Sequence, residues 1–200
     1  DPRTGRPRFA TERNFTGFSL FVAEAKATGQ PPTQSPTDPL RQDEPTMTEL
    51  LTGNDYEQRL TAALNATTGR LTIVMYQVSP NWSQPGLAAS ALFDTLIAQP
   101  ARRPQCRLIL GRPPTASTLA TLNDEAAALL TNAGWYVRRV PPYPVLHAKL
   151  WLIERGYVYA GSHNLSNRAT TSNTEAGILT TNGAAVETAR QFCEAQWNDS

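Results

Sequence analysis

The sequence predicts an α/β domain, and two observations lead to that prediction. From Thr46 onward, amphipathic segments of helical length alternate with short runs of apolar and β-branched residues, which is the pattern of helices alternating with strands. The chain has 200 residues, enough for one domain with a full hydrophobic core but hardly for two. We therefore expect a single α/β domain over residues 46–200.

The first helix and strand of this domain follow from capping and apolar residues. A helix is expected from Asp55 to about Ala66, with Leu60 and Leu64 on one face, and Thr67-Thr68-Gly69 ends it. Residues 70–77 (RLTIVMYQ) are rich in apolar and β-branched side chains. They are predicted to form a buried strand.

The same alternation continues to the C-terminus. Helices are predicted at 87–98, 118–132 and 184–197, and strands at 106–111, 135–140, 147–153, 157–162 and 174–180. The apolar residues of the 118–132 helix recur at helical spacing, and they are Leu119, Leu122, Ala126, Leu129 and Leu130. Gly134 ends this helix. The strands at 147–153 and 157–162 are joined tightly through Glu154-Arg155-Gly156.

Residues 1–45 differ from the rest because prolines interrupt them repeatedly. The prolines are Pro2, Pro7, Pro31, Pro32, Pro36, Pro39 and Pro45. This spacing predicts an extended arm or linker, in which residues 14–27 are apolar enough for a short strand or helix. The chain begins with Asp1 rather than Met, so we expect that processing or trimming has removed what preceded it, and this leaves room for an upstream domain.

Composition limits the cellular environments and the binding partners that are expected for this chain. No apolar run approaches the roughly 20 residues of a membrane-spanning helix, which predicts a soluble chain without stable membrane association. Two cellular locations remain as alternatives, the bacterial cytoplasm and a secreted or periplasmic location after processing. Cys106 and Cys193 are too few and too far apart for a disulfide framework or a recognisable metal site, and both are expected to be buried or incidental.

Basic residues gather in one part of a chain whose formal charge is only +1. Between Ala101 and Arg155 there are eight basic and three acidic residues, a net charge of +5. The arginines considered as substrate contacts, in and beyond this stretch, are Arg112, Arg138, Arg139 and Arg168. The alternative is that they form an ordinary solvated face.

Two pairs of polar residues have the spacing of a catalytic site. His147 and Lys149 are two residues apart on a predicted strand, so both project from one face, while Ala148, Leu150 and Leu152 face apolar packing. Imidazole titrates near neutrality and can act as nucleophile or as acid and base.

Ser162 and Asn164 share a face of the next strand in the same way, and Gly161 allows close backbone approach there. Lys, Asn and Ser can all donate hydrogen bonds to phosphoryl oxygens. The four polar groups are therefore predicted to converge on one anion.

The run HAKLWLIERGYVYAGSHN resembles the phospholipase D superfamily signature His-x-Lys-x4-Asp-x6-Gly-Ser-x-Asn, with every spacing kept. The resemblance extends to Asn173 and Glu175, which match the family's Asn-x-Glu, and to FCEAQW, which matches its Phe-x4-Trp. It covers about residues 46–200. It implies a phospholipase D-like domain, a mixed β-sheet flanked by helices on both faces, with one motif per chain as in the small bacterial endonucleases of the family.

One position departs from the signature. The family's Asp is Glu154 here, and in the family this acid supports the local turn rather than acting as the nucleophile. The substitution therefore leaves the chemistry plausible. An inactive copy that keeps the fold is the alternative.

The resemblance also implies a mechanism. His147 would attack phosphorus and become a phosphohistidine, while a second histidine protonates the leaving oxygen and later activates water. The chain has only one other histidine, His163, and alternation points it away from Asn164. We therefore expect a homodimer that brings two copies of His147 into one cleft.

Glu175 would orient a catalytic imidazole by a hydrogen bond, and its alternative is a solvated strand residue. Tyr76 and Trp151 are expected to lie in the core or to line the cleft, and base stacking on either is the less favoured alternative. The resemblance implies no metal and no other cofactor.

Three classes of function remain at this point. A nuclease acting on DNA or RNA is favoured by the single motif and the basic segment around it. A phospholipase or phosphatidyl transferase would use the same chemistry on a lipid. The third class is a nucleic-acid-binding module, or the nuclease part of a larger restriction, mobile-element or toxin protein.

Overall fold

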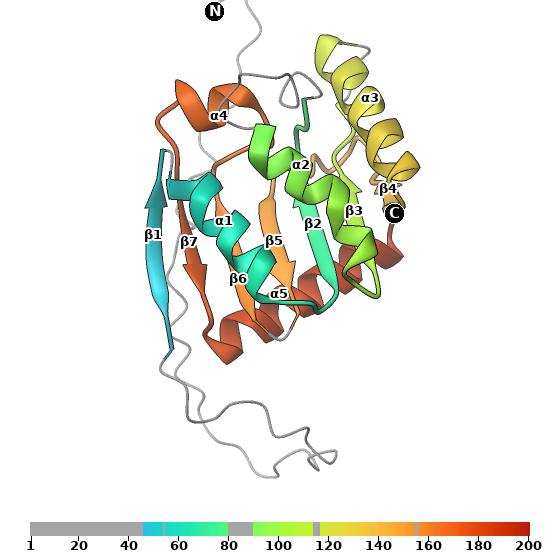
Figure 1. Ribbon diagram of the computed structural model, residues 1–200. Helices are drawn as coiled ribbons and strands as arrows, with labels where there is room; N and C mark the ends of the chain where they lie inside the picture. Colours follow the sequence, from blue (N-terminus) through green and yellow to red (C-terminus); the bar gives the residue numbers. More distant parts are fainter. Residues whose placement is uncertain (1–45, 54, 80–89, 114–116, 155) are drawn as a thin grey trace, which may run out of the picture. The chain divides into compact units, whose positions relative to one another are not determined.

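A seven-stranded mixed sheet with helices on both faces forms the domain in the computed structural model, which describes residues 46–53, 55–79, 90–113, 117–154 and 156–200 (Figure 1). The strands lie in the order β1-β7-β6-β5-β2-β3-β4. β2, β3 and β4 pair in parallel, and every other neighbouring pair is antiparallel. The α/β class and the mixed sheet that the sequence predicts are confirmed.

The elements follow the predicted order with three additions. The strands are β1 Thr48–Thr52, β2 Leu71–Met75, β3 Cys106–Leu110, β4 Tyr136–Arg139, β5 Lys149–Ile153, β6 Tyr157–Gly161 and β7 Ala176–Thr180. The helices are α1 Asp55–Ala66, α2 Ser90–Ala98, α3 Thr118–Asn132, α4 Asn167–Thr171 and α5 Gly183–Asn198, with a short 3-10 helix, η2, at Gln99–Ala101. The sequence prediction did not include β1, α4 or η2. The arm at 1–45 and the first three residues of the 87–98 helix lie outside the described residues.

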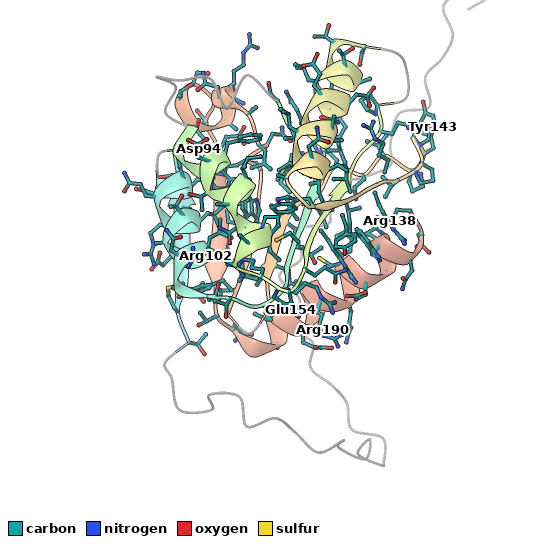
Figure 2. All side chains as sticks on the ribbon, turned by 45° about the vertical axis from the view of Figure 1, so that its right-hand side comes forward. Asp94, Arg102, Arg138, Tyr143, Glu154 and Arg190 are labelled. Atoms are coloured by element: carbon teal, nitrogen blue, oxygen red, sulfur yellow. The ribbon has the colours of Figure 1, made fainter. Side chains whose placement is uncertain are left out.

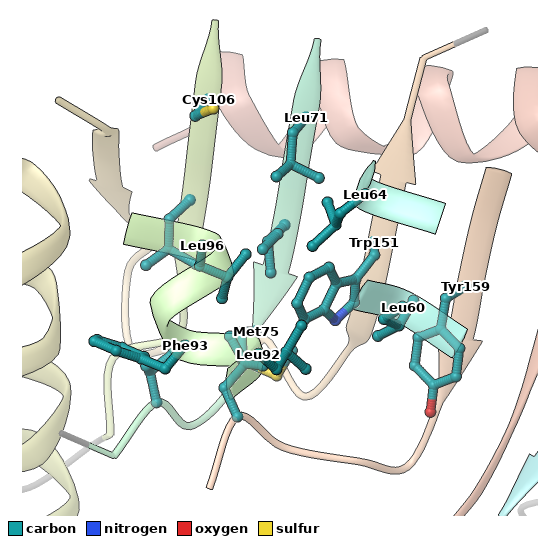
Figure 3. Packing of buried hydrophobic residues seen from close by; sticks show 14 of the residues in the cluster. Leu60, Leu64, Leu71, Met75, Leu92, Phe93, Leu96, Cys106, Trp151 and Tyr159 are labelled. Carbon is teal, nitrogen blue, oxygen red and sulfur yellow. The ribbon is translucent and has the colours of Figure 1, made fainter. Parts of the chain in front are cut away.

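Two hydrophobic cores lie on opposite faces of the sheet. The larger is built by α1, α2 and α3 against one face, and Figure 3 shows Leu60 of α1 and Leu92 of α2 near Trp151 of β5. The smaller core lies under α5, where Leu152 of β5 packs with Cys193 and Trp197. β5 therefore sends alternate side chains into different cores, as predicted for Leu150 and Leu152.

Details within the predicted elements are mostly confirmed. Gly134 has a φ of +97°, the left-handed conformation that ends α3. Leu129 of α3 is the exception, because it is 43 % exposed and Leu130 takes the buried position. Cys106 and Cys193 are free and buried, and burial raises the pKa of their thiols to about 11 and about 12.

A buried amide ties the ends of two parallel strands together. Asn123 of α3 is fully buried, and its Nδ2 donates to the carbonyl oxygens of Tyr76 and Gly111 at 2.9 and 3.2 Å. Its Oδ1 accepts from the backbone N of Val78 at 2.9 Å. One side chain thus satisfies three backbone groups just after β2 and β3.

Replacing Asn123 by leucine is expected to lower the free energy of unfolding by about 2–5 kcal/mol, because a side chain of similar size would leave these three groups unpaired. The measurement is urea denaturation, with a lower midpoint and an unchanged slope. Asn132→Leu on the exposed side of the same helix is the matched control. Equal midpoints for the two variants would contradict the bridging role of Asn123.

Candidate active site

The predicted catalytic residues gather at one edge of the sheet. β2, β3 and β4 all end there, and β5 begins there, because Met75 pairs with Lys149. β6 ends and β7 begins at the same edge, since Gly161 pairs with Gly177. Crevices beyond the carboxyl ends of parallel strands are the usual ligand sites of such sheets.

His147 and Lys149 lie in direct contact, as predicted. Lys149 Nζ is 3.1 Å from Nδ1 and 3.2 Å from Nε2 of His147, and it donates to the His147 carbonyl oxygen at 2.7 Å. β5 begins only at Lys149, so the pair spans the point where the chain enters the sheet. The imidazole is exposed, whereas Lys149 is 5 % exposed.

Burial lowers the pKa of both members of this pair, and the Lys149 charge adds to the shift of His147. Burial, followed by the Lys149 charge, lowers the pKa of His147, which favours the neutral imidazole that a nucleophile needs. Burial lowers the pKa of Lys149 to about 8, and the Glu175 carboxylate partly opposes that shift. A neutral imidazole beside an ammonium is thus the expected state at neutral pH.

Ser162, Asn173 and Glu175 form a second polar group at the same edge. Ser162 Oγ donates to Glu175 and accepts from the backbone N of Ala176 at 3.1 Å. Asn173 Nδ2 donates to Glu175 Oε1 at 2.9 Å. Glu175 makes no hydrogen bond to His147 in the described part of the chain, so its role in orienting an imidazole stays a prediction.

Asn164 follows this group and is half-buried. Its Oδ1 is buried and has no hydrogen-bond partner among the described residues. Asn164 lies at the same sheet edge, two residues beyond Ser162, but within the described residues its side chain makes no hydrogen bond to His147 or Lys149. Its predicted role as a donor to the substrate therefore stays a prediction.

His163 is fully buried, in agreement with the prediction that it points away from the site. Its Nδ1 lies 2.6 Å from the Tyr159 hydroxyl, and its ring stacks on Tyr56 with centroids 4.2 Å apart. Burial lowers its pKa, so the ring is neutral in this environment. His163 is a core residue and leaves His147 as the accessible imidazole.

Gly161 is required by close packing rather than by an unusual backbone angle. A Cβ at this position would overlap the Tyr159 hydroxyl and would approach Gly177 Cα to 2.6 Å. Gly161 and Gly177 together make the space that Tyr159 occupies. The predicted close approach is thus to the protein's own tyrosine, which in turn contacts His163.

Glu154, the departure from the signature, lies at the other end of β5 from Lys149. Its backbone N donates to the Arg70 carbonyl oxygen at 2.9 Å, and its carboxylate lies 3.4 Å from Arg70 Nη1. Arg70 also pairs with Glu194 of α5 at 2.9 Å. Glu154 therefore joins the β5–β6 hairpin to Arg70, which in turn pairs with α5.

The four candidate arginines divide into two pairs. Arg138 lies over the Trp197 ring, 4.4 Å from its centroid, and Arg139 pairs with Asp124 of α3. Figure 2 labels Arg138 beside α5. Arg112 and Arg168 are exposed near the site edge, the first just after β3 and the second on α4. Arg138 is exposed as well, but it is engaged by Trp197, whereas no hydrogen bond or ion pair engages the Arg112 and Arg168 side chains within the described residues. The second pair is therefore better placed to meet a substrate.

Two residues near the site were not predicted to support the catalytic pair. Tyr76, expected only to line the core or cleft, lies with its ring centroid 4.6 Å from that of His147. Asn123 supports the backbone around it. The sequence signal that could have identified Asn123 is a polar residue at a core-facing position of an apolar helix. Trp151 is fully buried, which excludes the base-stacking alternative for it in this fold.

A family profile described as "cardiolipin synthase, PLD-like domain" matches residues 60–197. The chain belongs to the phospholipase D-like family. The match includes the His147–Lys149 pair and the Gly161-Ser162 segment, so the site described above lies within the family's domain. The family is one of phosphodiester chemistry, in accord with the resemblance found in the sequence.

Solved structures show the same fold. Nuc from Salmonella typhimurium, described as a phospholipase D family member, aligns with a TM-score of 0.62 at 16% identity, over 76% of this chain and 96% of Nuc. NucT from Helicobacter pylori gives 0.57 at 13% identity, over 78% and 98% of the two chains. Polyphosphate kinase from Porphyromonas gingivalis gives 0.57 at 18% identity, over 77% of this chain but 26% of the kinase. Comparison with curated protein sequences gives no match.

Two kinds of feature are absent from the described residues. No group of three or more His, Cys, Asp or Glu side chains is arranged to hold a metal ion in that part of the chain. None of the helices described there is long and apolar enough to cross a membrane.

Proposed function

We propose that this protein is a metal-independent nuclease that cleaves phosphodiester bonds of DNA or RNA through a covalent phosphohistidine, in an active site shared by two copies of the chain. The observation that carries the proposal is the contact between His147 and Lys149 at the sheet edge. An exposed, neutral imidazole is presented there beside a buried ammonium.

In the first step, a ring nitrogen of His147 attacks phosphorus and the bond from phosphorus to the leaving oxygen breaks. A second imidazole, in its protonated form, gives its proton to that oxygen. In the second step the same imidazole, now neutral, takes a proton from water as the water oxygen attacks phosphorus and releases His147. Lys149 stabilises the charge on the non-bridging oxygens in both steps.

The second imidazole is the reason for proposing a homodimer. The chain has two histidines, and His163 is fully buried between Tyr56 and Tyr159. A twofold axis beside the site would supply another His147 from a second copy. The chain accounts for nearly the whole length of Nuc and NucT, which is consistent with one motif per chain.

An exposed apolar row beside the site suits such a second copy. Leu50 of β1 pairs with Ile178 of β7, which pairs with Ala160 of β6, and Leu50 and Ile178 are 65 % and 41 % exposed. Ala160 directly precedes Gly161, so the row continues to the site edge. A second copy that covers this row would exclude water from apolar side chains and bring its own site edge close.

The homodimer is tested by solution mass. The native chain should have about twice the 21.9 kDa of one copy, and Leu50→Asp combined with Ile178→Asp should give monomers with little activity. Leu129→Asp, which changes a leucine of similar exposure on α3, is the matched control and should remain dimeric. A fully active monomer would contradict the shared site.

Nucleic acid is the proposed substrate because exposed arginines lie at the site edge. Arg112 directly follows Gly111, whose backbone N donates to the Met75 carbonyl oxygen at 2.9 Å. Arg168 lies on α4, four residues after Asn164. Guanidinium groups on both sides of the His147–Lys149 pair could contact phosphates that flank the cleaved one.

The substrate class is tested by incubating the purified protein with plasmid, single-stranded DNA, RNA and vesicles of phosphatidylcholine or phosphatidylglycerol, all in excess chelator. Nucleic-acid cleavage that persists under these conditions is the expected result. The lipid samples are included because the matching family profile is described by a lipid enzyme. Headgroup release or exchange without nucleic-acid cleavage would overturn the nuclease proposal in favour of a lipid phosphodiesterase.

A further inference from the structure

One tyrosine ring contacts both members of the catalytic pair. Tyr76 follows the last residue of β2, and its ring lies at 51° to that of His147 with 4.6 Å between the centroids. Lys149 Nζ lies 5.2 Å from the centre of the same ring. The imidazole and the ammonium are therefore both in contact with one rigid aromatic group.

The backbone of Tyr76 is fixed from the opposite side. Asn123, fully buried in α3, bonds to the Tyr76 carbonyl oxygen and the Val78 backbone N, both at 2.9 Å. The amide also holds Gly111, where an added Cβ would lie 3.3 Å from Tyr76 Cδ2 and 2.9 Å from the Leu146 carbonyl oxygen. Tyr76 is thus confined between the end of β3 and the residues that lead into His147.

We propose that Tyr76 is a positioning residue, whose ring holds the His147 imidazole and the Lys149 ammonium in the orientation needed to act on one phosphoryl group. The inference rests on the proposed function. The negative face of an aromatic ring attracts an ammonium, and the tilted contact limits rotation of the imidazole. Correct orientation of a nucleophile contributes a large part of the rate in such reactions.

The kinetic test compares Tyr76→Leu, which removes the aromatic face, with Tyr76→Phe, which keeps it. Leucine should lower kcat about 10- to 100-fold with KM changed by less than about threefold, and phenylalanine should stay within about threefold of the native kcat. Tyr136→Leu is the matched control, because Tyr136 is 58 % exposed on β4. Native kcat in the leucine variant, or equal losses in both variants, would overturn the proposal, the second because the hydroxyl would then be the acting group.

A second measurement needs no turnover. The chain has two histidines, so its NMR spectrum contains two Hε1 signals, and the nearby Tyr76 ring should displace that of His147. The signal should move in Tyr76→Leu and stay near its native position in Tyr76→Phe, while the His163 signal stays fixed in both. An unmoved His147 signal in a folded leucine variant would show that the ring does not hold the imidazole.

The two measurements separate the possible failures. If the native protein cleaves no phosphodiester, the proposed function fails, while the NMR comparison still decides whether Tyr76 holds His147. If cleavage occurs and the Tyr76 variants behave like Tyr136→Leu, only the positioning role fails. If Tyr76→Leu shows no cooperative thermal unfolding transition, Tyr76→Met replaces it. The expected changes in kcat and in the His147 signal are the same for that variant.

Discussion

The substitution His147→Ala is expected to abolish phosphodiester cleavage, with a loss of at least about 10⁴-fold in the single-turnover rate. His147 is proposed to form the covalent bond to phosphorus, and removal of a nucleophile generally costs several orders of magnitude. In the described structure it is the exposed imidazole, in contact with Lys149. The measurement is the single-turnover rate on the best substrate of the chelator panel, together with acid-quench trapping of labelled phosphohistidine.

His163→Phe is the matched control for this prediction. Phenylalanine can keep the stack on Tyr56 but loses the contact between His163 Nδ1 and the Tyr159 hydroxyl. We expect lower stability with the rate preserved within about tenfold, because His163 is fully buried. If the folded His163 variant lost the labelled intermediate while the His147 variant kept it, the nucleophile would have been assigned to the wrong histidine.

The sequence predicted the juxtaposition of His147 and Lys149 better than the boundaries of the strand that carries them. The two-residue spacing of His147 and Lys149 places them side by side even though β5 begins only at Lys149. β1 was missed because it is an edge strand with one buried residue, Leu51, so it lacks an apolar run. α4 has five residues, too few for a helical periodicity to appear.

Contacts between distant segments explain what the sequence could not predict. The hydrogen bond from Ser162 to Glu175 depends on the pairing of β6 with β7, which spacing along one strand does not reveal. Arg138 and Arg112 look equivalent in the sequence, but Arg138 pairs with Ile109 of β3 and contacts Trp197 of α5. The sequence shows which positions carry a charge, but the tertiary fold determines which residue each charged side chain contacts.

The substitution Lys149→Met is expected to lower kcat about 100- to 1000-fold while the fold is retained. Methionine keeps the length of the buried stem, but it removes the ammonium that is proposed to stabilise charge on the phosphoryl oxygens. Single-turnover kinetics at saturating substrate measure this loss. A far-ultraviolet circular dichroism spectrum and a thermal unfolding transition check that the fold is retained. Native kcat in Lys149→Met would exclude Lys149 from the transition state.

The pH dependence of kcat/KM gives a second and independent test of Lys149. In the proposed mechanism one copy of His147 acts as the neutral nucleophile and the other as the protonated acid. The pKa of His147 lies below its ordinary value, so the two imidazoles set the acid limb and the first alkaline fall of the profile. The Lys149 ammonium is also the active form and burial lowers its pKa to about 8, so the alkaline fall should steepen as the pH rises through about 8. Lys149→Arg should remove this steepening, because guanidinium stays charged throughout the range, although the maximal rate should be lower since its planar shape fits differently. A steepening near pH 8 that persists unchanged in Lys149→Arg would have to arise from another group.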